Sequence, residues 1–153
     1  MFYYKNITFG PYGLLSESQQ QHYDYKIVNE DKFNNEEALV IEAIPKSEEV
    51  SHDLYGKAWV RKADFSILKI EWEQKSIENF EVSESIAKFF NAEPLISVVA
   101  IYGFEKNGIR FPSEFSITEA YINKVSLNKS ARSRTSISYD DYKFFTVETE
   151  VKY

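Results

Sequence analysis

The residue types of a serine nucleophile relay occur together once in the chain, at residues 51–53, where the sequence is SHD. Adjacent residues on a polar loop cannot converge on one another as the three members of a relay do. The only other histidine is His22, and neither histidine lies in an HExxH or EF-hand spacing. The absence of cysteine excludes thiolate nucleophiles, disulfides and Cys-ligated zinc. We therefore expect no catalytic residues and no metal site.

Two pairs of glutamates lie two residues apart, Glu71 with Glu73 and Glu148 with Glu150. Paired carboxylates perform acid/base chemistry when burial raises the pKa of one of them. Charges that alternate along a strand are more often its solvated face. A carboxylate-based hydrolase is therefore the weakest hypothesis, and the sequence predicts a protein that is not an enzyme and carries no cofactor.

A basic cluster near the end of the chain could hold a phosphate or a lipid headgroup, although the flank of a solvated loop is the simpler interpretation. It consists of Lys124, Lys129, Arg132 and Arg134. The net charge of −6 argues against nucleic acid as a partner, which requires a basic surface, and against electrostatic docking of the whole chain on anionic lipid. No apolar stretch approaches the roughly 20 residues of a transmembrane helix.

The sequence predicts that most of the chain forms β-strands. Aromatic residues make up 16% of the 153 residues, and such side chains suit the half-buried surface of a sheet. Alternating or continuous apolar runs predict strands at residues 2–9, 23–28, 38–44, 95–105, 110–121, 132–139 and 144–153. Asn34-Asn35 predicts a turn, and Asn107-Gly108 predicts a tight hairpin that sets Glu105 opposite Arg110 and Phe104 opposite Phe111.

A further hairpin at residues 55–73 carries both tryptophans. A two-residue turn at Ala63-Asp64 sets Trp59 opposite Leu68, Lys57 opposite Ile70 and Tyr55 opposite Trp72. This register predicts one large aromatic face with both tryptophans on it. Replacement of a buried Trp59 by alanine would then reduce stability by roughly 3–5 kcal/mol.

A helix is expected to cover that face. Four apolar residues follow helical spacing, namely Val82, Ile86, Phe89 and Phe90. Asn79 is a suitable N-cap and Pro94 would end the helix. The core beneath such a helix is either filled or leaves an apolar cavity for an acyl chain. The expected ligand-binding residues are Tyr55, Trp59, Leu68, Ile70, Trp72, Ile86 and Phe89.

Three segments resemble the outer-membrane lipoprotein-sorting proteins of the LolA/RseB type. They are YGKAWVRKADFSILKIE at residues 55–71, which is similar to that family's central hairpin, GIRFPS at residues 108–113 and the closing YDDYKF at residues 139–144. The chain departs from the family pattern at Arg61, where Asp is common, and at Ile67, where Pro is usual.

The resemblance implies a curved antiparallel sheet, or half-open β-barrel, with a covering α-helix and a LolA-like cavity that binds lipid or lipoprotein acyl chains in the periplasm or cell envelope. Residues 1–5 lack a basic segment followed by an apolar one, so we expect no signal peptide within these 153 residues, and the first expected strand starts at residue 2. We therefore expect residues 1–153 to form a single domain of a longer envelope protein. The alternative is a structural or protein-interaction β domain with a filled core and no ligand.

Overall fold

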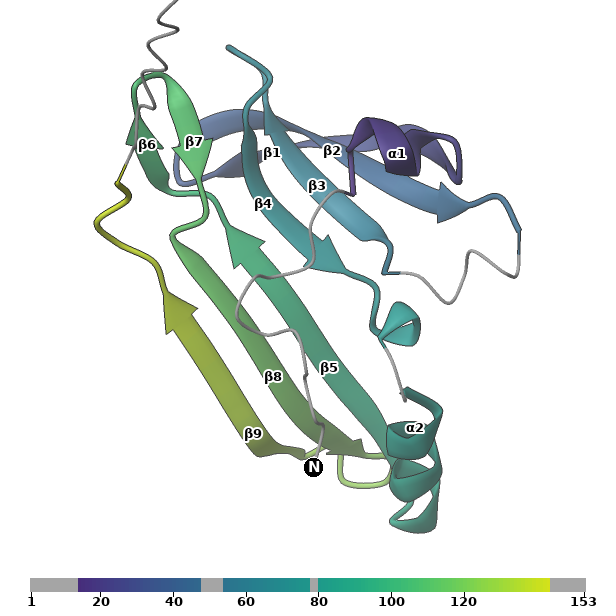
Figure 1. The fold of residues 1–153 in the computed structure, drawn as a ribbon. Helices are drawn as coiled ribbons and strands as arrows, with labels where there is room; N and C mark the ends of the chain where they lie inside the picture. Colours follow the sequence, from purple (N-terminus) through teal and green to yellow (C-terminus); the bar gives the residue numbers. More distant parts are fainter. Residues whose placement is uncertain (1–13, 48–53, 78–79, 144–153) are drawn as a thin grey trace, which may run out of the picture.

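The computed structural model describes residues 14–47, 54–77 and 80–143 (Figure 1). The strands are β1 (Tyr23–Phe33), β2 (Glu36–Pro45), β3 (Gly56–Arg61), β4 (Ile67–Trp72), β5 (Ala92–Ile101), β6 (Phe104–Lys106), β7 (Ile109–Phe111), β8 (Glu114–Asn123) and β9 (Lys129–Ser138). The helices are α1 (Glu17–Gln20), the 3₁₀ turn η3 (Gln74–Ser76) and α2 (Phe80–Phe89). The predicted strands at residues 2–9 and 144–153, and the SHD run at residues 51–53, lie outside the described residues.

The strands form one curved antiparallel sheet of seven, in the order β1-β2-β3-β4-β5-β8-β9, and a separate two-stranded hairpin of β6 and β7 (Figure 1). All strand pairings among the described residues are antiparallel, and within these residues the sheet does not close into a barrel. The predicted fold class, a mostly β protein with a curved antiparallel sheet and one substantial helix, is confirmed. No helix in the described part of the chain is long and apolar enough to span a bilayer.

Two of the predicted turns are confirmed. Asn34 and Asn35 have φ angles of 50° and 66°, which asparagine tolerates better than most residues, and they join β1 to β2. Asn107 and Gly108, with φ angles of 56° and 73°, join β6 to β7 in the predicted register. In both places the residues that permit a positive φ mark the turn in the sequence.

The predicted register of the β3–β4 hairpin is wrong by one residue. Trp59 lies opposite Lys69, and Trp72 lies opposite Gly56. Because successive residues of a strand point to opposite faces, a shift of one residue transfers a side chain to the other face. The two tryptophans therefore lie on opposite faces of the sheet, and the single aromatic face expected from the sequence does not form.

The turn that sets this register spans four residues instead of the expected Ala63-Asp64 pair. The Arg61 backbone N–H donates to the Ser66 carbonyl at 2.8 Å, and the Phe65 N–H donates to the Arg61 carbonyl at 2.9 Å. Phe65 has a φ of 59°. A left-handed conformation at phenylalanine carries no signal in the sequence, since glycine or asparagine is the usual residue there.

Helix α2 is confirmed, but it ends for a different reason and buries a different face from those predicted. Asn91, with a φ of 49°, follows the helix in the left-handed conformation that commonly ends one, whereas Pro94 lies inside β5. The buried residues of α2 are Phe80, Ser83 and Ala87.

The main core lies on one face of the sheet, which we call the core face. Its rows run across neighbouring strands: one joins Ala58, Ile70, Ala100 and Phe115, and the next joins Gly56, Trp72, Val98 and Ile117. Short elements cover it, since Leu14 next to α1, Ile77 after η3 and Phe80 of α2 belong to the same buried cluster. Among the described residues, three separate segments therefore contribute to the cover of this face.

Candidate functional site

Four of the seven predicted ligand-binding residues are buried or half-buried in the region of the core. Ile70 and Trp72 lie in the core cluster and are 2% and 3% exposed. Leu68 is buried at the irregularity of the β3–β4 hairpin. Tyr55 packs against the core cluster from the segment before β3, and burial, together with the nearby Glu73 charge, raises the pKa of its hydroxyl.

Trp59 lies on the opposite face of the sheet. The Lys69 ammonium sits 3.9 Å from the centre of its ring, and the indole N–H donates to Asp31 at 2.9 Å. This hydrogen bond is the main reason that the pKa of Asp31 is lowered. The indole is thus held by a cation and a carboxylate on a half-buried surface, and Trp59 cannot line the core face.

Ile86 and Phe89 also lie away from the core face, because α2 turns its predicted apolar stripe towards solvent. The exposed fractions are 56% for Val82, 36% for Ile86, 83% for Phe89 and 66% for Phe90. Val82, Ile86 and Phe89 belong to α2 and Phe90 follows it directly, and all four are exposed. The expectation that this stripe packs on the sheet is wrong, since the smaller Ser83 and Ala87 take that position.

The core face is densely occupied by the chain's own side chains. Trp72 and Phe115 meet edge to face, with ring centres 6.2 Å apart. Both are at most 4% exposed, as are Ile96, Val98 and Ile117. An acyl chain would therefore have to enter this face by displacing part of its cover.

A buried carboxylate lies at one end of the core face, and the sequence analysis did not single it out. Glu119 is 3% exposed. It accepts hydrogen bonds from the Tyr121 hydroxyl at 2.8 Å, the Arg132 guanidinium at 3.1 Å and the Ser133 hydroxyl at 3.3 Å. One indication was present in the sequence, because Glu119 lies two residues after Ile117 and such residues point to the same face of a strand. Arg132, which was expected in a basic cluster, instead neutralises this carboxylate.

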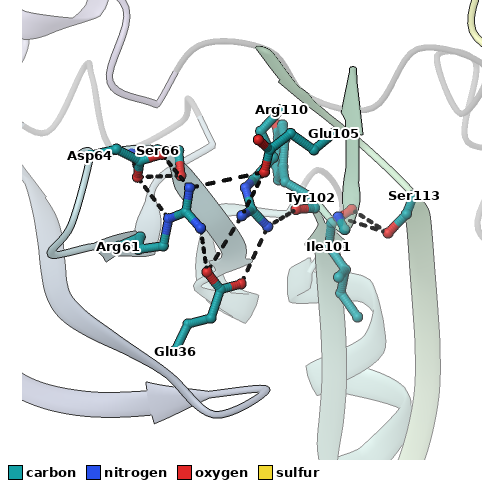
Figure 2. Close-up of polar contacts among 10 residues, drawn as sticks. Glu36, Arg61, Asp64, Ser66, Ile101, Tyr102, Glu105, Arg110 and Ser113 are labelled. Atoms are coloured by element: carbon teal, nitrogen blue, oxygen red, sulfur yellow. Dashed lines mark hydrogen bonds and ion pairs between the residues drawn. The ribbon is translucent and has the colours of Figure 1, made fainter. Parts of the chain in front are cut away.

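A second polar cluster joins the β6–β7 hairpin to the large sheet (Figure 2). Glu36 at the start of β2 accepts hydrogen bonds from Arg61 at 2.6 Å and from Arg110 at 3.4 Å. Asp64 pairs with Arg61, and Glu105 pairs with Arg110 at 3.3 Å. Three carboxylates face two guanidinium groups, so the cluster offers no excess positive charge to an anion. Its geometry fits a structural clasp between hairpin and sheet.

Arg110 is the most enclosed member of this clasp. Its side chain is 11% exposed, and it also donates to the Tyr102 carbonyl at 3.2 Å (Figure 2). The Nε atom of Arg110 is buried without a hydrogen-bond partner among the described residues. Because the side chain at position 110 is enclosed next to several acceptors, arginine suits this position, since its planar group can donate to several acceptors at once.

Replacement of Asp64 by asparagine is expected to reduce stability at neutral pH and to matter less in acid. The Arg61 guanidinium, with the Ser66 N–H and hydroxyl, holds the pKa of Asp64 well below its usual value. A lowered folded-state pKa stabilises the fold above the unfolded value of about 4, and this contribution is lost as the pH falls towards the folded pKa. Urea denaturation at several pH values measures the difference in the free energy of unfolding between the wild type and Asp64→Asn.

The exposed Asp140 provides the control for this comparison. Asp140→Asn should leave the stability close to that of the wild type throughout the range. A pH-independent difference between wild type and Asp64→Asn would contradict the role of the Asp64 charge.

Fold and geometry together define a class, a mostly β protein with an open, curved antiparallel sheet and an apolar core face under a short helical cover. Comparisons with protein families, with curated proteins and with solved structures found no match for this chain. Among the described residues, no three His, Cys, Asp or Glu side chains are grouped so as to hold a metal ion. Two apolar surfaces of the described residues are therefore the candidate binding sites, the core face and the exposed stripe of α2.

Proposed function

We propose that this chain is a non-catalytic lipid-binding domain of a bacterial cell-envelope protein, which holds acyl chains against its core face. The observation that carries the proposal is the pairing of a continuous apolar face on an open, curved sheet with a cover made of short segments. α1 has four residues and η3 has three. Elements with few buried contacts open at lower free energy than the strands they cover.

The resemblance to lipoprotein-sorting proteins supports the same proposal. Its central segment, residues 55–71, includes Ile70 and ends next to Trp72, and both residues belong to the core cluster. A periplasmic or envelope location is proposed on the basis of this resemblance alone.

The alternative proposal is a structural or protein-interaction domain with a filled core. The observation in its favour is the burial of Leu68, Ile70 and Trp72 by the chain itself, to 3% exposure or less. A ligand that needed these side chains would compete with contacts that already exist. The two proposals differ in whether the core face accepts an added apolar chain.

Titration with fatty acids of increasing length distinguishes the two proposals, because the tryptophans lie on opposite faces. In Trp59→Phe the only remaining tryptophan is Trp72 on the core face, and in Trp72→Phe it is Trp59 on the other face. We expect ligand to change the fluorescence of Trp59→Phe, with affinity rising up to about fourfold per added methylene until the site is full.

The Trp72→Phe variant serves as the matched control, and its fluorescence should not respond to ligand. Native mass spectrometry of the purified protein provides an independent measurement of bound lipid. Affinity that does not change with chain length, or no binding at all, would favour the filled-core alternative.

A further inference from the structure

Four large apolar side chains are exposed together at one end of the molecule, and we call them the apolar tip. They are Phe89, Phe90, Val125 and Leu127, and their exposed fractions are 83%, 66%, 81% and 75%. Phe89 is the last residue of helix α2 and Phe90 follows it, whereas Val125 and Leu127 lie in the turn between β8 and β9 (Figure 1). Apolar side chains at such exposure are ordinary singly, but a group of them indicates an interaction surface.

The two halves of the apolar tip are held side by side by the backbone. The Lys124 N–H donates to the Asn91 carbonyl at 3.0 Å, directly between the helix end and the turn. Ala92 of β5 pairs with Asn123 of β8 in the adjoining part of the sheet. Phe89 and Phe90 meet edge to face, with ring centres 5.1 Å apart. The tip is therefore one surface built from two distant parts of the sequence.

The turn holds its apolar residues in a defined conformation. The Asn123 side chain accepts hydrogen bonds from the backbone of Val125 and of Ser126, both at 2.9 Å. The Leu127 N–H donates to the Asn123 carbonyl at 2.9 Å, and Leu127 has a φ of 57°. Bonds within the turn thus keep Val125 and Leu127 in place while both remain exposed.

The charges next to the apolar tip have a small positive excess, in contrast to the chain as a whole, whose net charge is −6. Residues 84–93 and 124–129 contain three lysines, Lys88, Lys124 and Lys129, and two glutamates, Glu84 and Glu93. Lys88 pairs with Glu84 at 3.2 Å and Lys124 pairs with Glu93 at 3.3 Å. Lys129 makes no ion pair within the described part of the chain. Basic groups around exposed apolar side chains match a surface that is apolar inside and anionic outside.

The opposite end of the molecule does not have this character. The β3–β4 turn exposes a single phenylalanine, Phe65, at 73%. Its charged neighbours include the carboxylates of Asp64, Glu36 and Glu105. These carboxylates pair with Arg61 and Arg110, and the cluster offers no excess positive charge to an anionic surface, unlike the apolar tip, where Lys129 has no ion pair among the described residues.

We propose that the apolar tip docks this protein on an anionic phospholipid bilayer. Phe89, Phe90, Val125 and Leu127 enter the boundary between headgroups and acyl chains, and Lys129 lies against phosphate groups. The apolar tip consists of several projecting side chains from two segments, and the lipids of a fluid bilayer can pack around each of these side chains. The exposed Val82 and Ile86 extend the apolar contact along α2. This surface is separate from the core face and does not depend on acyl-chain binding there.

Vesicle flotation tests the proposal. The wild-type chain should float with vesicles of phosphatidylcholine and phosphatidylglycerol in equal parts, and much less with phosphatidylcholine alone. Phe89→Ser or Leu127→Ser should weaken binding by about tenfold, because each removes a large apolar group from the bilayer. Lys129→Ala should weaken it by about fivefold, and only on the anionic vesicles. Phe65→Ser, an equally exposed residue at the other end, should bind as the wild type does.

The absence of cysteine allows the orientation to be measured directly. A polarity-sensitive fluorophore on Ser126→Cys should shift to the blue on anionic vesicles, whereas the same label on Ala63→Cys in the β3–β4 turn should not. No flotation, an equal loss in Phe65→Ser, or a shift at position 63 in place of 126 would overturn the proposal. So would a dimer in vesicle-free solution that Phe89→Ser dissociates, since the tip would then be an interface between two copies.

Discussion

Replacement of Trp72 by alanine is expected to reduce the free energy of unfolding by about 3–5 kcal/mol, the usual range for deletion of a buried tryptophan. Trp72 is 3% exposed and contacts Phe115 edge to face. It lies opposite Gly56, which has no side chain. The loss would leave a cavity in the middle of the core face that strands on both sides cannot close. Urea denaturation followed by circular dichroism measures the change.

Trp59→Ala is the matched control, since the same side chain is removed from the other face. We expect a loss of about 1–2 kcal/mol, because the half-buried indole gives up the contact with the Lys69 ammonium and part of its buried area. This replaces the 3–5 kcal/mol that follows from the register expected from sequence alone. Equal losses in the two variants would contradict the placement of the tryptophans on opposite faces.

Replacement of Gly56 by alanine is expected to have the second large effect, a destabilisation of about 3 kcal/mol or more, at the upper end of the range for overpacking. A Cβ atom at Gly56 would lie 2.1 Å from the Glu71 carbonyl oxygen and 2.7 Å from Trp72 Cα. Both atoms belong to the backbone of β4, so relief requires β3 and β4 to separate. Thermal and urea unfolding measure the loss.

Gly103→Ala provides the comparison for this variant. The nearest atom to a Cβ at Gly103 is the Ser113 hydroxyl oxygen at 2.8 Å, which belongs to a side chain that can rotate. We expect a loss of about 1 kcal/mol or less, chiefly from the strained hydrogen bond between the Gly103 N–H and that hydroxyl. A Gly56→Ala variant as stable as Gly103→Ala would show that the strands adjust more easily than their geometry indicates.

The parts of the fold that local chemistry specifies were predicted correctly. The Asn107-Gly108 turn fixed the pairing of Phe104 with Phe111, because both turn residues permit the positive φ of a tight hairpin. Alternating apolar residues predicted β1, β2, β5 and β8, and helical spacing predicted α2. In each case the decisive interactions lie within a few residues of one another in the chain.

The candidate site was predicted less well, because it depends on which face each element presents. One left-handed residue, Phe65, lengthens the β3–β4 turn and moves Trp59 to the far side of the sheet. The burial of Glu119 depends on Arg132, thirteen residues away in the sequence, and on the hydroxyl groups of Tyr121 and Ser133. Neither effect has a local signal that distinguishes it from ordinary alternation.

Local sequence patterns were enough to predict that this protein is mostly β, that α2 has an apolar side, and that Asn107-Gly108 closes a hairpin, since backbone preferences and periodicity are local properties. That the apolar side of α2 faces solvent depends instead on how the helix packs against the sheet. Close packing on β5 requires small residues at the contact, and Ser83 and Ala87 meet this requirement where Phe89 cannot. The same packing brings Phe89 next to the β8–β9 turn and creates a surface that neither segment contains alone.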